Sequence, residues 1–266
     1  MPQHILANYH THTPLCHHAT GSEEEYIQTA IKCGYDVLGF SDHTPWAYAD
    51  PNFVSRIRML PSELDGYAAS LNALREKYAD KLRIHIGLEA EYFPAYFDWL
   101  LEEKERLGIE YLIFGCHYDT TDETGIYFGR PACADDIRRY AEQVAAGLET
   151  GAFAYLAHPD LFLHGCHTFG SDEEKACRQI CAAAAGLGVP LEYNLAGLES
   201  HNHPEGTLGY TNELFWQIAA EYPVKAIIGC DAHAPQQLDA VKLLRKSQRY
   251  LCKLGIYVID TLPGLE

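Results

Sequence analysis

Short apolar runs that end on a metal-binding type of side chain recur along this chain and constrain its fold more than any other feature. Seven such runs are present, and six of them end on histidine, aspartate or glutamate. Segments with the apolar spacing of helices lie between them. Alternation of strand and helix predicts parallel strands with helices packed outside. The runs are 5–12, 36–43, 82–91, 111–117, 153–158, 190–194 and 224–233, and the helical segments are 22–34, 61–80, 134–151, 172–188 and 211–222.

The number of these repeats and the chain length predict one closed or nearly closed α/β barrel. The chain has 266 residues, of which 47% are hydrophobic, and a single barrel commonly reaches this size. We therefore expect one domain spanning residues 1–266. In such barrels functional residues lie at the C-terminal ends of the strands. The polar residues that end the runs fall at those positions, so they are expected to converge.

The charge balance argues against nucleic acid as a partner and in favour of metal ions. Lys and Arg number 20 and Asp and Glu number 37, which gives a net charge of −17. Such a chain lacks the basic surface that binds the phosphates of DNA or RNA. It also repels small anionic substrates at long range. A site for a phosphate ester would therefore need local positive charge, which bound metal ions supply.

Cysteine usage and the N-terminal segment predict a cytoplasmic protein. The nine cysteines are scattered, and none of them forms a CxxC pair. The segment MPQHILANYH lacks the basic and apolar parts of a signal peptide. No apolar run approaches the roughly 18 residues of a membrane span. We expect reduced thiols and no membrane partner, whereas the oligomeric state is left open.

Two pairs of polar residues have the spacing of metal ligands on strands. His10 and His12 are two residues apart, as are Asp231 and His233. Side chains at positions i and i+2 of a strand point to the same side, so each pair can bind one ion. Imidazole and carboxylate together suit zinc, manganese or iron. The neighbouring thiol of Cys16 is expected to be a small buried side chain.

The order of these motifs resembles the polymerase and histidinol phosphatase (PHP) family, and most closely its histidinol-phosphatase branch. The resemblance covers about residues 8–235 and implies a distorted (β/α)7 barrel that hydrolyses a phosphate monoester. The implied substrate is L-histidinol phosphate, an intermediate of histidine biosynthesis. Alternatives are another phosphorylated metabolite, or a non-catalytic or exonuclease-like PHP module. The motifs are HTHTPLCHH, GFSDHTPW, IGLEAEYFP, FGCH, LAHPD and IIGCDAHAP.

The resemblance also implies a ligand set for two to three divalent ions of zinc, manganese or iron. Glu89 is expected to bridge the first and second ions. Its neighbour Glu91 is expected to be a second acid that either supports the site or is exposed, and Asp42 is expected to orient His43. The motif spacing favours His18 over His17. The implied ligands are His10, His12, Glu89 and Asp231 for the first ion, Glu89, His117 and His158 for the second, and His18, His43 and His233 for the third.

The resemblance implies catalysis by metal-activated water. Asp231 is expected to orient the water, and His233 is a candidate to protonate the leaving alcohol. The family commonly has an arginine where this chain has Glu199. A carboxylate repels phosphate, so either another cation, Arg58 or Arg130, contacts the substrate, or Glu199 binds its ammonium group.

Two histidine-containing loops are expected to face the site. The first contains His164 and His167, and the second contains His201 and His203.

Overall fold

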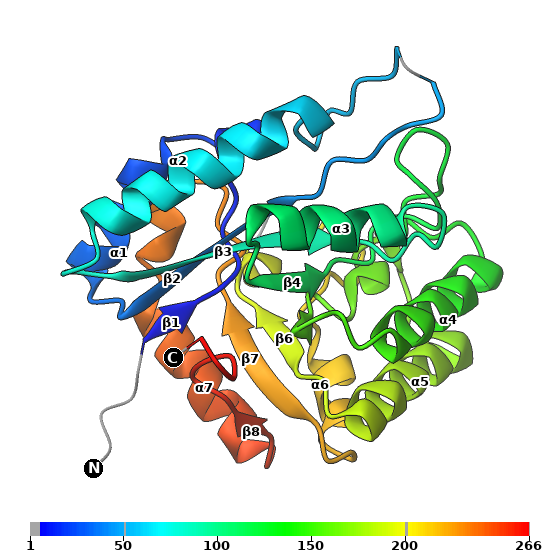
Figure 1. The fold of residues 1–266 in the computed structure, drawn as a ribbon. Helices are drawn as coiled ribbons and strands as arrows, with labels where there is room; N and C mark the ends of the chain where they lie inside the picture. Colours follow the sequence, from blue (N-terminus) through cyan, green and yellow to red (C-terminus); the bar gives the residue numbers. More distant parts are fainter. Residues whose placement is uncertain (1–5, 51, 200–201, 266) are drawn as a thin grey trace. The chain divides into compact units, whose positions relative to one another are not determined.

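The computed structural model describes residues 6–50, 52–199 and 202–265, in which parallel strands alternate with helices (Figure 1). The strands are β1 (Ala7–Asn8), β2 (Val37–His43), β3 (Arg83–Ala90), β4 (Tyr111–Phe114), β5 (Tyr155–Leu156), β6 (Leu191–Asn194), β7 (Lys225–Gly229) and β8 (Tyr257–Val258). The helices are α1 (Glu23–Cys33), α2 (Leu64–Lys77), α3 (Phe97–Leu107), α4 (Ala134–Glu149), α5 (Ser171–Leu187), α6 (Glu213–Ala219) and α7 (Val241–Lys253). The alternation predicted from the sequence is confirmed.

The chain divides into two compact units, which we describe separately. The first unit comprises the described residues of 1–113, 230–242 and 260–266, and the second comprises 114–229 and 243–259, apart from the undescribed positions. The expectation of one domain over residues 1–266 stays a prediction. Among the described residues, no helix combines the length and the apolar character that a membrane span requires.

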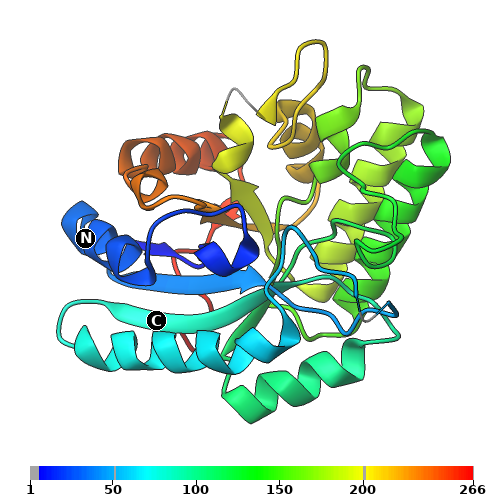
Figure 2. The ribbon, with the colours of Figure 1, turned by 90° about the horizontal axis from the view of Figure 1, so that it is seen from above.

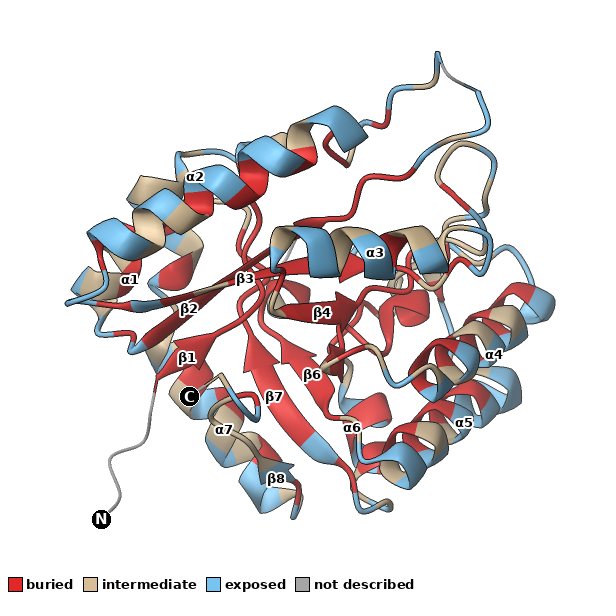
Figure 3. Cartoon of the chain, viewed as in Figure 1, coloured by how far each residue is buried: buried red, intermediate tan, exposed pale blue. Residues whose placement is uncertain are grey.

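Parallel pairing of β1, β2 and β3 forms the centre of the first unit. Every residue of β2 is buried, as expected for a parallel strand covered on both faces. Figure 3 shows the buried strands and the exposed outer faces of α1 and α2. The register places His43 at the end of β2 opposite Glu89 on β3. Two expected ligands from distant parts of the sequence are therefore neighbours.

The segment that follows β7 returns to the first unit and pairs with the end of β1. Thr11 and Ala232 form a parallel bridge, and the His12 N–H donates to the Ala232 carbonyl at 2.9 Å. The Cys230 N–H donates to the Asn8 side chain at 2.7 Å. These bonds bring the two i, i+2 pairs of the sequence side by side.

The second unit contains the parallel pairs β5–β6, β6–β7 and β7–β8. Helices α4 and α5 pack against each other and lie side by side in Figures 1 and 2. In the register of this sheet Asn194 at the end of β6 lies opposite Gly229 at the end of β7.

A tyrosine of β4 packs over glycines of two neighbouring strands of the first unit. The Tyr111 hydroxyl donates to the carbonyls of Tyr9 at 2.8 Å and Phe40 at 3.1 Å. A Cβ atom added at Gly87 would lie 2.5–2.7 Å from ring atoms of Tyr111, and one added at Gly39 would overlap its hydroxyl. The absence of side chains at these glycines lets the ring reach the carbonyls.

We predict that Gly87→Ala lowers the free energy of unfolding by about 1–3 kcal/mol, because the added methyl group overpacks this contact. Gly66→Ala is the matched control. Gly66 lies in exposed α2 with nothing within 4 Å of an added Cβ, so this change should stabilise by up to about 1 kcal/mol. Urea unfolding of both variants measures the difference. Equal stabilities of Gly87→Ala and the parent protein would contradict the packing described.

Candidate metal centre

Two imidazoles and two carboxylates of the first unit meet at the ends of β1 and β3. His10 and His12 are fully buried, and their Nε2 atoms lie 3.2 Å apart. The Asp231 carboxylate lies 3.3 Å from Nε2 of His10 and 3.2 Å from Nε2 of His12. The Glu89 carboxylate lies 3.5 Å from both nitrogens. Each of the two carboxylates thus lies within 3.5 Å of both imidazoles.

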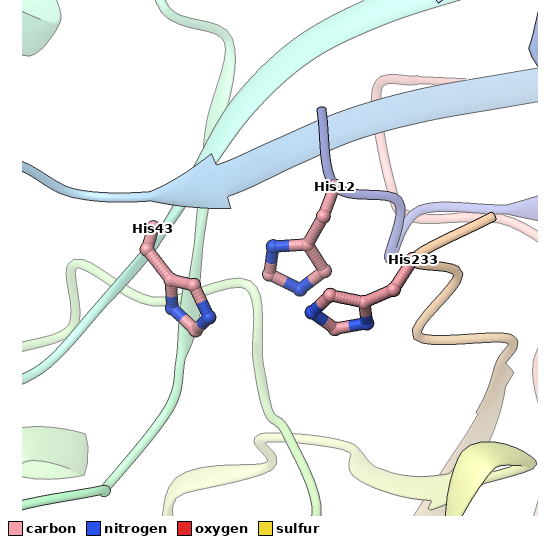
Figure 4. Close-up of side chains that lie close together, drawn as sticks. All are labelled: His12, His43 and His233. Atoms are coloured by element: carbon pink, nitrogen blue, oxygen red, sulfur yellow. The ribbon is translucent and has the colours of Figure 1, made fainter. Parts of the chain in front are cut away.

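Three more histidines of the first unit surround this group. The His43 Nδ1 lies 3.0 Å from the Glu89 carboxylate. The ring of His233 lies 4.0 Å from that of His12 and 4.5 Å from that of His18, centre to centre. Figure 4 shows the rings of His12, His43 and His233 converging. Their ligand atoms all lie within 4.8 Å of one another.

The structure brings His18 rather than His17 into this ring cluster. His17 ends a short 3₁₀ turn with φ of 65°. Both residues are exposed, but the ring of His18 contacts the rings of His12, His43 and His233. The next residue, His18, bonds through Nδ1 to the Cys16 carbonyl at 2.7 Å, which leaves its Nε2 for a metal. The thiol of Cys16 is also fully buried and belongs to a group with His18 and His233 that is close enough to share an ion. Burial raises its pKa to about 12, so the sulfur stays a neutral thiol, which is a poor ligand.

Asp42 contacts two histidines of the cluster, His43 and His12. Its carboxylate lies 3.4 Å from Nδ1 of His12 and accepts the backbone N–H and the hydroxyl of Thr13. It contacts His43 through the backbone N–H at 2.8 Å. Asp42 therefore contacts His43, the residue it was expected to orient, at the backbone and contacts His12 at the ring. A carboxylate at Nδ1 of His12 would leave Nε2 to bind a metal ion.

The electrostatics of the buried cluster favour positive charge at its centre. Burial lowers the pKa of His12, but hydrogen bonds to Asp231 and Asp42 and the charge of Glu89 outweigh it and raise the pKa to about 9. Burial would raise the pKa of Asp231, yet the charge of His10 and the hydrogen bond from His12 hold it well below its usual range. Asp231 is therefore ionised at neutral pH.

His233 and His18 have the opposite tendency. Burial, together with the charge of His12, lowers the pKa of His233 to about 3, and burial lowers that of His18. Among the described residues, Nε2 of His233 is buried without a hydrogen-bond partner. Neutral imidazoles with an open nitrogen beside ionised carboxylates are the donors that divalent transition metals require. The clusters of the first unit are therefore able to bind metal.

The two remaining expected ligands meet in the second unit. His117 and His158 are buried, and their rings are 4.9 Å apart. The His158 backbone has φ of 28°, a conformation that non-glycine residues rarely adopt. Its N–H donates to the carboxylate of Glu192 at 3.0 Å. Glu192 was not expected from the sequence, because it lies inside the run 190–194 and functional side chains were expected at the ends of the runs.

The expected substrate contacts have very different surroundings. Arg58 is fully buried and forms an ion pair with Glu91, which is also fully buried. The Trp46 indole donates to Glu91 at 3.2 Å, and Arg58 donates to the Thr44 carbonyl at 3.2 Å. Of the two alternatives expected for Glu91, burial excludes the exposed one, and Arg58 is held away from solvent.

The loop residues are more accessible. Arg130 is exposed, and Glu199 is half-buried at the end of a 3₁₀ turn after β6. His164 and His167 bond to the carbonyls of Gly129 and Gly206. His201 lies outside the described residues.

Comparisons with known proteins identify a family and a fold that this chain shares. The model of the PHP domain family matches residues 8–196. A Deinococcus radiodurans protein named "Probable histidinol-phosphatase" is 29% identical over 268 residues, which cover 90% of this chain and 93% of that protein. A Lactococcus lactis histidinol phosphate phosphatase, crystallised with zinc, L-histidinol and phosphate, superposes with a TM-score of 0.73 and 15% identity over 98% of both chains. The Listeria monocytogenes protein hisK superposes with a TM-score of 0.70 and 23% identity over 87% of this chain and 96% of that one. The two structures show that the predicted fold class, an α/β fold of the PHP type, is correct.

We predict that Glu91→Ala destabilises the protein by about 3–5 kcal/mol, because it leaves the Arg58 guanidinium buried without its carboxylate. The double change Arg58→Met with Glu91→Leu should cost less than Glu91→Ala alone, since no charge is then buried. Asp65→Ala is the control. It breaks the exposed pair with Arg106 and should cost below about 1 kcal/mol. Chemical denaturation compares the variants, and a double variant weaker than Glu91→Ala would refute this account.

Proposed function

This chain belongs to the PHP domain family, and from that premise we propose that it is a metal-dependent phosphoric monoester hydrolase that releases phosphate from L-histidinol phosphate. The observation that carries the proposal is that the carboxylates of Glu89 and Asp231 both lie within 3.5 Å of ring nitrogens of His10 and His12. The name of the Deinococcus radiodurans relative, which matches nearly the full length of both chains, supports the substrate.

We assign the metal ligands as the family resemblance orders them. His10, His12, Glu89 and Asp231 would hold one ion. Glu89 has a second oxygen with which to bridge to another ion, for which His117 and His158 are the further ligands. A third ion would be held by His18, His43 and His233. The donor set suits zinc, manganese or iron.

Individual residues of the cluster would have different roles in hydrolysis. Bound divalent ions would neutralise charge on the phosphoryl oxygens and make water acidic enough to react near neutral pH. Asp231, in contact with His10 and His12, is placed to orient the attacking water. His233 was expected from the sequence to protonate the leaving alcohol, but its pKa is lowered to about 3, so the ring is neutral near pH 7 and better suited to bind metal than to donate a proton. The buried environment keeps the ligands fixed before substrate arrives.

One observation favours a second candidate, which is the same reaction on a different phosphorylated metabolite. Glu199 occupies the position where the family commonly has an arginine. The Arg58 guanidinium is already paired with Glu91. Arg130 is exposed and is therefore the better candidate to contact phosphate. Glu199 would then bind a cationic group of the substrate. Histidinol phosphate has an ammonium group that fits this role, as do other amino-phosphates.

We predict about two to three metal ions per chain, because nine ligands at three or four per ion fill three sites when Glu89 is shared. Glu89→Ala should remove more metal than His18→Ala, since a bridging carboxylate serves two ions. His17→Ala is the matched control and should retain all metal. Elemental analysis after expression with manganese or zinc gives the count. A value at or below about one ion would rule out the trinuclear assignment.

We predict that the protein hydrolyses histidinol phosphate and that a metal chelator stops the reaction. Glu199→Gln should lower kcat/KM for this substrate by about 10- to 100-fold, because a hydrogen bond to a charged group contributes a free energy of that size. The same variant should leave hydrolysis of glycerol phosphate, which has no amine, within about twofold. Phosphate-release kinetics measure both substrates. Trace turnover of histidinol phosphate by the parent protein with a large gain in Glu199→Arg would instead favour the second candidate substrate class.

A further inference from the structure

The second unit contains a buried carboxylate that contacts the backbone of an expected ligand. Glu192, on β6, has no exposed surface. One of its oxygens, Oε2, accepts the His158 N–H at 3.0 Å and the Asn194 side-chain N–H at 2.8 Å. Both donors are neutral. Burial of a carboxylate is unfavourable unless hydrogen bonds compensate for lost hydration, and these two bonds contribute to that compensation.

The backbone that Glu192 contacts is in an unusual conformation. His158 has φ of 28°, and such strain persists only where the surroundings hold it. The His158 carbonyl accepts the Tyr140 hydroxyl at 3.3 Å and the Leu161 N–H at 3.0 Å. The peptide groups on both sides of the His158 α-carbon are thus fixed. Because the backbone sets where Cβ points, these bonds also set the direction of the imidazole.

The neighbouring strand leaves room for the carboxylate. A Cβ atom added at Gly229, at the end of β7, would overlap Oε1 of Glu192. The Gly229 backbone is buried and lies opposite Asn194 in the sheet. A side chain at this position would displace Glu192 from His158. The glycine therefore offers a second way to disturb the same contact without changing the carboxylate itself.

We propose that Glu192 is a positioning residue that holds His158, through its peptide N–H, in the conformation that binds a divalent metal ion. The inference rests on the proposed function, in which His158 is a ligand. Partners of metal-binding histidines usually bond to the free ring nitrogen. Glu192 acts on the backbone instead, because the strained conformation of His158 is what needs support. Loss of this contact would let the backbone relax and turn the ring away.

The test is a zinc titration of the full-length protein after removal of metal, by equilibrium dialysis against zinc sulfate. Glu192→Ala should weaken one zinc site by about 10- to 100-fold, the usual effect of removing a partner of a ligand. Glu192→Gln should retain most of the affinity, because its amide oxygen can accept both N–H bonds. Ile180→Ala truncates a buried side chain of α5 and controls for lost stability. It should lower the melting temperature and leave zinc binding unchanged.

Gly229→Ala provides a test that keeps Glu192 in the chain and serves if Glu192→Ala does not fold. The added methyl group should weaken the same zinc site by pushing the carboxylate away. In the Glu192→Ala background the methyl group has no carboxylate to displace, so Gly229→Ala should add little further loss. Such non-additivity is the signature of two residues that act through one contact.

His158→Ala separates failure of this inference from failure of the proposed function. If His158→Ala retains all zinc while His10→Ala loses it, His158 is not a ligand and the assigned second metal site fails. If His158→Ala loses zinc and Glu192→Ala does not, the positioning role alone is overturned. Equal losses in Glu192→Gln and Glu192→Ala, or a comparable loss in Ile180→Ala, would also overturn it.

Discussion

Two buried carboxylates create a requirement for positive charge at the centre of the first unit. Glu89 is 1% exposed and Asp231 is 7% exposed, and both face the same nitrogens of His10 and His12. Carboxylates that lose hydration side by side need positive charge between them. In the metal-free chain His12, with its pKa raised to about 9, supplies that charge as an imidazolium. A divalent ion would supply more of it and displace the proton, so metal binding and proton release are coupled. The carboxylates thus make the site attract metal, and the imidazoles complete it.

Hydrogen bonds between backbone segments bring these side chains together. The bridge between Thr11 and Ala232 joins segments more than 200 residues apart. The register of β2 against β3 sets His43 opposite Glu89. Where regular structure does not point a ligand correctly, the backbone leaves the usual conformations, as at Asp231 with φ of 50°. Strain of this kind collects at functional sites because the surrounding structure is rigid enough to hold it.

The sequence predicted the features that depend on local pattern and missed those that depend on tertiary contact. Strand ends and ligand candidates followed from apolar runs and from motif order. The helices α3 and α7 and the short strand β8 were not predicted. The apolar side chains of 97–107 and 241–253 do recur at helical spacing, so the sequence could have predicted these two helices, whereas a two-residue strand has no periodicity to detect. The same limit applies to Arg58. Its pairing with Glu91 joins residues 33 positions apart, and no local pattern encodes such a contact. Asp42 was placed correctly as a supporting residue, but which ring it holds depends on the packing of β1 against β2.

The burial of Arg58 changes how this chain would recognise a phosphate. The positive charge of the Arg58 guanidinium is largely neutralised by Glu91, and the group also donates to the Thr44 carbonyl. It therefore contributes little electrostatic attraction for a phosphate group. The rest of the chain is strongly acidic, with a net charge of −17. In the proposed function the attraction for a phosphate group would then come mainly from bound metal ions, which act on every phosphate alike. Selectivity requires a group that distinguishes one phosphate ester from another. In the proposed function a carboxylate at Glu199 would do so by binding the ammonium group of an amino-phosphate, which a substrate without an amine does not offer. An arginine at that position would instead strengthen binding of every phosphate.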